Sequence, residues 1–224
     1  MKHFITFLAI LVSAVAIAQK SIEKSVGDFT TLKVYDLIEV ELIKSDENKV
    51  EITGENSESV LVNNLNGTLK IKMKFKEIFD GANTKVMLYY SKIDVIDANE
   101  GTKISSKDEI KQFEIDLRAQ EGGQINANLN VSYANVRAVS GGVVEASGFS
   151  KNENIALMTG GVFKGEHLKS EISDVSINAA GEAYINSSKE ANIAIRAGGD
   201  VYIYGNPETV NESKVLGGRI KRME

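Results

Sequence analysis

The chain has 224 residues, of which 42% are hydrophobic and 25% charged, with no cysteine, no tryptophan and a single proline. The lack of cysteine excludes a disulfide framework and thiolate chemistry, and two histidines leave a Ser-His-Asp triad or a His-rich metal cluster almost nothing to draw on. A formal net charge of -5 argues against the basic stripe that nucleic-acid binding needs, so no nucleic-acid partner is expected.

The first 18 residues are predicted to be a signal peptide. Lys2 and His3 precede an apolar run over residues 4–17, and the small residues that end in Ala18 provide a cleavage site before Gln19. No later segment is apolar enough to cross a membrane, so no integral membrane segment is expected after cleavage. The mature chain, residues 19–224, is therefore expected to be exported, whether periplasmic, associated with the outer surface or secreted.

Residues 29–91 contain five short segments in which apolar and polar residues alternate, which predicts strands. Turn clusters at 45–48 and 63–67 separate some of them. No Pro/Ser-rich linker divides this part from the rest, so residues 19–224 are interpreted as one domain, with 29–91 as N-terminal coils that cap it. The five segments are 32–35, 38–42, 50–52, 69–73 and 86–90. A closing strand near Ile220 and a fraying terminus remain alternatives for the C-terminal end.

Residues 92–205 carry a repeat. Five pairs of small residues recur, their second members 19, 19, 20 and 18 residues apart, and each pair lies between two runs with period-2 alternation. A worn copy lies around Gly101. The pairs are Gly122-Gly123, Gly141-Gly142, Gly160-Gly161, Ala180-Gly181 and Gly198-Gly199.

A repeat of about 19 residues with two or three strands corresponds to one coil of a β-solenoid, in which every strand bonds to its counterparts in the neighbouring coils. Glycine suits the sharp bend that each coil requires. The sequence therefore predicts an all-β, parallel β-helix (β-solenoid) with ~19-residue coils and an N-terminal β cap, in which the second residues of the pairs lie in single file. An antiparallel meander with Gly-rich hairpins is the alternative.

The Gly-Gly-punctuated strands, the segment 122–126 (GGQIN), its echo at 183–186 (AYIN), the leader and the Gly-Asn-Pro at 205–207 resemble the DUF2807 family. This is the putative auto-transporter adhesin head "GIN" domain of Bacteroidetes-type bacteria, and the resemblance covers about residues 29–220. It implies a right-handed β-helix similar to pectate-lyase-like folds, export, no recognised catalytic set, and cell adhesion. Ala180 and the residues at 145, 164 and 202, which are not Asn, depart from the pattern.

Two sets of outward-facing residues are candidate ligand-binding strips. Tyr184 and Tyr202 fall in register one coil apart, and Tyr204 is close to them, which suits stacking on a sugar or a protein. Arg118 and Arg137 stack in another column, where they could hold a carboxylate or sulfate of an acidic glycan. For both strips the alternative is an ordinary solvated sheet surface.

Acidic residues are the place to look for a catalytic or metal site. The repeat stacks Glu182 on Asp200, two like charges that raise one pKa or hold a cation, and it pairs Glu145 with Lys164 as a surface ion pair. Asp94 and Asp97 are expected two coils from Asp116 at best. Because no cluster of three carboxylates emerges, we expect no catalytic residue and no cofactor, and Glu182 and Asp200 are the candidate metal contacts.

Two functions from different classes remain. The first is an exported, non-catalytic binding or structural module that contacts a glycan or an envelope or surface protein through a solenoid face, as in cell adhesion. The second is a carbohydrate-active lyase or hydrolase on a pectate-lyase-like β-helix. Fold alone does not decide between them.

Overall fold

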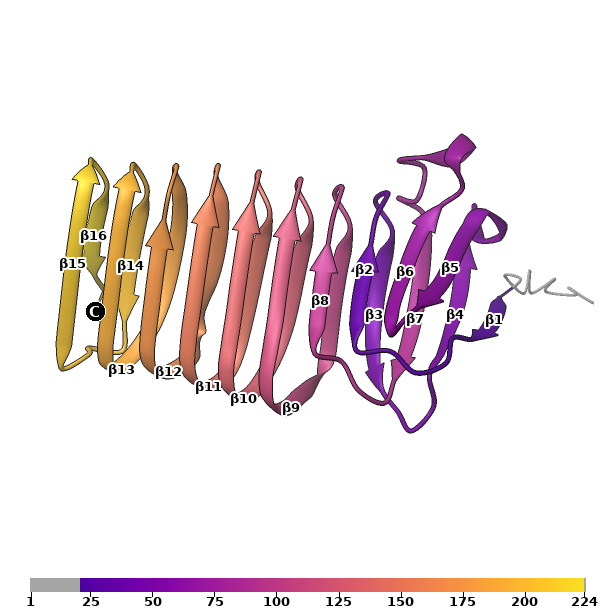
Figure 1. Ribbon diagram of the computed structural model, residues 1–224, viewed down its shortest axis with the longest axis horizontal. Helices are drawn as coiled ribbons and strands as arrows, with labels where there is room; N and C mark the ends of the chain where they lie inside the picture. Colours follow the sequence, from indigo (N-terminus) through magenta and orange to yellow (C-terminus); the bar gives the residue numbers. More distant parts are fainter. Residues whose placement is uncertain (1–20, 224) are drawn as a thin grey trace, which may run out of the picture.

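The computed structural model describes residues 21–223, in which one continuous sheet winds into a solenoid (Figure 1). Five long strands form its regular part, and each pairs in parallel with the next, so that Ile125 lies opposite Val144, nineteen residues further on. These strands are β9(Lys103–Gln120), β10(Gln124–Val139), β11(Val143–Met158), β12(Gly161–Ile177) and β13(Gly181–Ala197). The parallel register confirms the β-solenoid and excludes the antiparallel meander for the repeats.

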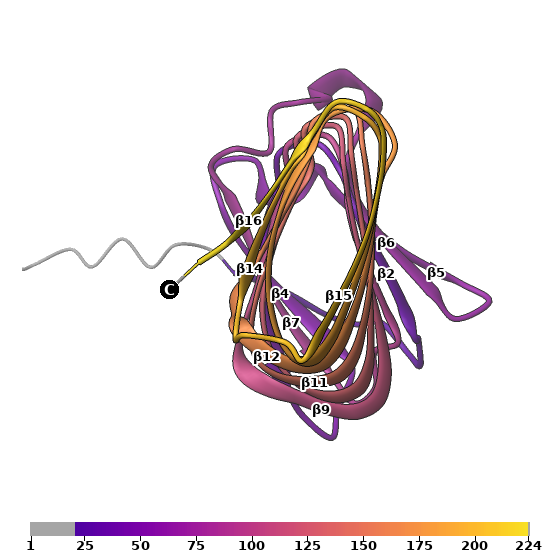
Figure 2. The ribbon, with the colours of Figure 1, turned by 90° about the vertical axis from the view of Figure 1, so that its left-hand side faces the viewer.

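Each long strand bends in its middle, so that a coil is a flattened loop with two broad faces (Figure 2). The first half of β13 pairs with β14(Asp200–Tyr204), and its second half pairs with β15(Thr209–Leu216). We call the two surfaces the β14 face and the β15 face. At the other end of the molecule, β3(Glu39–Lys44) continues the β14 face and β8(Val95–Ala98) continues the β15 face.

The core lies between the two faces. Because side chains alternate along a strand, every second residue points inward and meets its counterparts in the coils above and below. Val136, Ile155, Val175 and Ile193 form one such buried column.

The paired small residues form the tight bend that the sequence predicts. Glu121 and Gly122 have φ of 51° and 76°, two successive positive values of the kind found in a type I′ turn. The second glycine then passes close to the preceding coil, and a Cβ on Gly123 would lie 2.2 Å from the carbonyl oxygen of Ala98. The same collision recurs coil by coil, 2.1 Å from Ala119 O at Gly142 and 2.1 Å from Ala138 O at Gly161, which places these glycines in single file.

The N-terminal end closes with antiparallel strands. β1(Ile22–Ser25), β4(Lys49–Gly54) and β7(Thr84–Tyr90) pair in antiparallel order on the β14 face, and β5(Val60–Leu65) pairs with β6(Thr68–Met73) on the β15 face. The five strands predicted in this part correspond to β2(Thr31–Val34), β3, β4, β6 and β7. The turn predicted at 63–67 is partly wrong, because its first three residues belong to β5, whose pairing with β6 overrides their turn propensity.

The C-terminal end has a closing strand, β16(Arg219–Arg222), which contains Ile220 and pairs in parallel with β14. Two 3₁₀ turns complete the cap, η1(Ser57–Ser59) and η2(Phe75–Glu77). The predicted signal peptide, residues 1–18, lies outside the described residues. Within residues 21–223, no helix has the length and apolar character needed to cross a membrane.

Candidate binding trough on the β15 face

A ladder of amide and carboxylate side chains runs along the β15 face, one rung per coil. Asn135 donates a hydrogen bond from Nδ2 to Asp116 Oδ1 at 2.9 Å, Asn192 donates to Asp174 Oδ1 at 2.8 Å, and Asn211 donates to Asn192 Oδ1 at 2.8 Å. We call the set the amide ladder. Its six rungs, in register from coil to coil, are Asp116, Asn135, Asn154, Asp174, Asn192 and Asn211.

A column of small side chains lies beside the amide ladder, two residues further along each strand. Ala156, Ser176, Ala194 and Ser213 are in register there. Because these side chains are short, the surface sinks between the ladder and the edge of the face. Two hollows result, of about 560 Å³ and 390 Å³, and both are lined by Asn154, so they form one trough.

Basic side chains take over this column toward the cap. Arg118 and Arg137 lie directly opposite one another. Arg118 Nη2 lies 2.6 Å from Asp116 Oδ2, whereas Arg137 has no ion-pair partner within 4 Å among residues 21–223. Arg137 is thus an exposed, unneutralised cation in the wall of the trough.

Two more charged side chains line the same hollow, Lys33 and Asp97, whose Nζ and Oδ2 atoms are 3.3 Å apart. The expected separation of Asp97 and Asp94 from Asp116 is wrong. β8 pairs directly with β9, so Asp97 lies opposite Arg118, and the Asp116 N–H donates to Asp94 O at 2.9 Å. The sequence hides this proximity because the cap strands do not follow the 19-residue period.

An aromatic pair stands at the cap end of the trough. Phe113 is 68% exposed, and its ring centroid lies 5.3 Å from that of Tyr133. Phe113 lines a hollow of about 950 Å³ that shares Asp116 with the trough. Sequence reasoning missed both residues, although an isolated Phe within the polar run at residues 111–114 is the signal that could have revealed one of them.

The tyrosines singled out in the sequence lie on the opposite, β14 face. Tyr184 and Tyr202 stack with ring centroids 4.7 Å apart and planes inclined by 11°, and Tyr204 lies opposite Asn186 in the neighbouring column. Burial, followed by the hydrogen bond to Glu182, raises the pKa of Tyr184 to about 12. The two predicted strips therefore do not form one site.

Glu182 and Asp200 lie opposite each other, as the register predicts, but other side chains engage both. Arg219 holds Asp200 with two hydrogen bonds, Nε to Oδ1 at 2.8 Å and Nη2 to Oδ2 at 2.5 Å, and this keeps the pKa of Asp200 below its usual range. The Tyr184 hydroxyl donates to Glu182 Oε2 at 3.1 Å. Residues 21–223 contain no group of three His, Asp or Glu side chains arranged to hold a metal ion.

Glu145 and Lys164 also lie side by side in register on the β14 face. The ion pair expected between them is not formed, because within the described chain neither charged group has a partner of opposite sign within 4 Å. Both side chains extend into solvent, where such a pair contributes little.

Solved structures share this architecture. A putative adhesin from Bacteroides fragilis superimposes with a TM-score of 0.84 at 16% identity, over 93% of this chain and 98% of that one. A putative lipid binding protein from Parabacteroides distasonis gives 0.71 at 16% identity, over 92% and 96%, and a putative adhesin from Parabacteroides merdae gives 0.71 at 13%, over 92% and 96%. At such identities the likeness is one of fold. None of the curated proteins matches the sequence.

The family comparison covers most of the chain. Residues 28–207 match the family model DUF2807, described as "Putative auto-transporter adhesin, head GIN domain". That description names a binding role and no reaction. The chain therefore belongs to the DUF2807 family.

Proposed function

We propose that this protein is an exported, non-catalytic binding module that holds an extended glycan along the trough of the β15 face. The observation that carries the proposal is the amide ladder, six rungs in register beside a column of small side chains. An amide both donates and accepts hydrogen bonds, so successive rungs suit the hydroxyl groups of a polymer that lies along the solenoid axis.

Other features of the trough support a sugar ligand. The exposed rings of Phe113 and Tyr133 offer apolar faces at one end. Arg137 offers a planar, unneutralised guanidinium that suits the carboxylate or sulfate group of an acidic glycan. The predicted leader and the adhesin description of the family support a location outside the cytoplasm, where such polymers occur.

The test compares ladder variants with a matched control. Biolayer interferometry on immobilised neutral glucans, polyuronates and sulfated glycans should detect binding that falls about tenfold or more in Asn154→Ala/Asn192→Ala, since each lost hydrogen bond contributes about 1 kcal/mol. Asn126→Ala removes an exposed amide from the β14 face and should leave binding unchanged. Equal loss in all variants, or no binding to any glycan, would sink the proposal, and capture of an envelope protein in its place would redirect it.

A second candidate function is a polysaccharide lyase or hydrolase. Lys33, Asp97, Asp116, Arg118 and Arg137 line one hollow, a grouping of acidic and basic side chains on a β-helix that suits proton transfer from a bound polyuronate. Incubation with polyuronates and neutral glycans, followed by an assay for new reducing ends, tests it. Turnover that disappears in Asp116→Asn would replace the binding module with an enzyme.

A further inference from the structure

The loop between β6 and β7 displays three large apolar side chains to solvent. Phe75 is 87% exposed, Phe79 58% and Ile78 42%. Their loop, with the η2 turn, projects beyond the ends of the cap strands (Figure 1). Isolated exposed apolar residues are ordinary, but three within five residues at the tip of a projection mark an interaction surface.

The backbone holds this tip in place. Phe79 has φ of 64°, a left-handed conformation that is unfavourable for a bulky side chain and persists only where the surroundings enforce it. The carboxylate of Asp36, which is 4% exposed, lies beneath the loop and accepts hydrogen bonds from the N–H of Met73 at 2.9 Å and of Phe79 at 3.4 Å. The loop therefore presents its apolar side chains outward instead of folding them onto the cap.

Basic side chains surround the tip. Lys70 and Lys72 point outward from β6, and Lys74 and Lys76 flank Phe75. From residue 68 to residue 79 the chain carries four lysines and one acid, Glu77, although the whole chain has a net charge of -5. Lys70 and Lys72 line a hollow of about 380 Å³ together with Phe75 and Ile78, and the acids Asp36 and Glu100 line its inner side.

We propose that this loop docks on the surface of an anionic phospholipid bilayer. Phe75, Ile78 and Phe79 enter the boundary between headgroups and acyl chains, and the surrounding lysines meet the lipid phosphates. Charge complementarity selects this occupant, because the basic segment projects from an otherwise acidic molecule. The site lies on the cap, so a docked molecule keeps the trough of the β15 face accessible, and the proposal does not depend on glycan binding.

The absence of tryptophan from the chain allows a direct test. Phe75→Trp creates a single fluorophore at the tip, and Leu216→Trp creates one at the opposite end of the molecule, where Leu216 is 70% exposed. Phosphatidylglycerol vesicles should shift the emission of Phe75→Trp to the blue and leave that of Leu216→Trp unchanged. No shift, or the same shift in both variants, would overturn the proposal.

Vesicle co-sedimentation of the full mature chain gives the second readout. Binding to phosphatidylglycerol vesicles should exceed binding to phosphatidylcholine vesicles, weaken with added salt, and fall about tenfold in Phe75→Ser/Phe79→Ser and in Lys70→Glu/Lys72→Glu. Leu216→Ser is the matched control and should bind like the wild type. Equal binding of all variants contradicts lipid docking, as does light scattering that shows the loop buried in a dimer that Phe75→Ser/Phe79→Ser dissolves.

Discussion

The most unusual single residue of the interior is Glu153. It occupies an inward position on β11, between Ala134 and Ser173 in the neighbouring coils, and is 1% exposed. Ser173 donates a hydrogen bond to its Oε2 at 2.9 Å, whereas Oε1 has no partner in the structure. Burial raises the pKa of Glu153 to about 8, so the group is mostly protonated at neutral pH.

Glu153 makes stability fall as pH rises. The unfolded chain loses this proton near pH 4.5 and the folded chain only near pH 8, so the folded state binds more protons across that window and the free energy of unfolding decreases through it. The decrease reaches roughly 3–5 kcal/mol by pH 8 at about 1.4 kcal/mol per pKa unit.

Glu153→Gln should remove this contribution. Urea unfolding at pH 5 and pH 8 should show a difference in stability that is several kcal/mol smaller in the variant than in the wild type. Glu145→Gln, at an exposed position, should keep the wild-type difference. Parallel pH profiles for the wild type and Glu153→Gln would mean that Glu153 is not held neutral.

The glycine pairs allow a sharper comparison of neighbouring residues. A Cβ on Gly142 would lie 2.1 Å from Ala119 O, whereas one on Gly141 would meet nothing within 4 Å. Gly141→Ala should therefore cost only about 1–2 kcal/mol, the strain of its positive φ. Gly142→Ala should cost about 3 kcal/mol, because the coils must separate locally. Thermal or urea unfolding checks the order, and equal losses would contradict the close approach.

At the scale of elements, the two ends of the solenoid avoid unlimited stacking in different ways. The N-terminal end turns to antiparallel strands. At the C-terminal end, β15 and β16 place charged residues in the inward columns, with Glu212 opposite Ile193, Lys214 opposite Ile195 and Arg222 opposite Ile203. Inward charges on an edge strand oppose the addition of another strand.

Replacing these charges should make the end adhesive. Glu212→Val/Lys214→Ile keeps the net charge but extends the apolar columns to the edge, so association through β15 should appear as a larger mass in size-exclusion chromatography with light scattering. Glu208→Val/Lys221→Val makes a comparable exchange at two exposed positions and should remain like the wild type. If neither variant associates, the inward charges are not what protects the edge.

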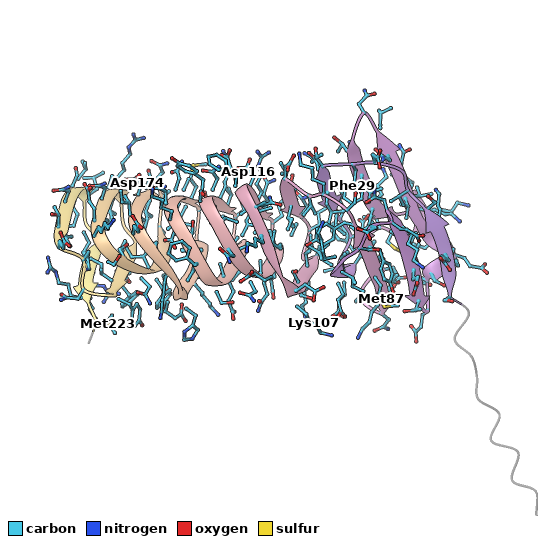
Figure 3. All side chains as sticks on the ribbon, turned by 90° about the horizontal axis from the view of Figure 1, so that it is seen from below. Phe29, Met87, Lys107, Asp116, Asp174 and Met223 are labelled. Atoms are coloured by element: carbon cyan, nitrogen blue, oxygen red, sulfur yellow. The ribbon has the colours of Figure 1, made fainter. Side chains whose placement is uncertain are left out.

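At the scale of the whole molecule, the stack makes the β15 face long and regular. Asp116 and Asp174 lie along one edge of the molecule in Figure 3, and Met87 lies along the opposite edge. With strands ~4.8 Å apart, the six rungs of the amide ladder span about 24 Å.

This length predicts how affinity depends on ligand size. If a polymer lies along the trough, calorimetry with a series of oligosaccharides should show affinity that rises with chain length and levels off near about 24 Å, when all rungs are occupied. A dimer that binds as tightly as longer chains would indicate a single local pocket, such as that beside Phe113, and not an extended trough.

The candidate site could be predicted only in part. Arg118 and Arg137 were placed correctly in one column, because the repeat period alone brings them together. The amide ladder was overlooked, although its rungs follow the same period, because attention went to the Asn126 column. Asp97 and Phe113 lie where the cap meets the first coils, a junction with no period to follow.

The sequence by itself determined the coil length, the inward and outward columns and the bends, because strand alternation and glycine conformations are local and each coil repeats them. Only the tertiary structure decided the direction of the cap strands, the partners of Asp200 and Glu153, and the exposure of Phe75 and Phe79. Those depend on which side chains from distant segments meet, and neither alternation nor the period of a repeat carries that information.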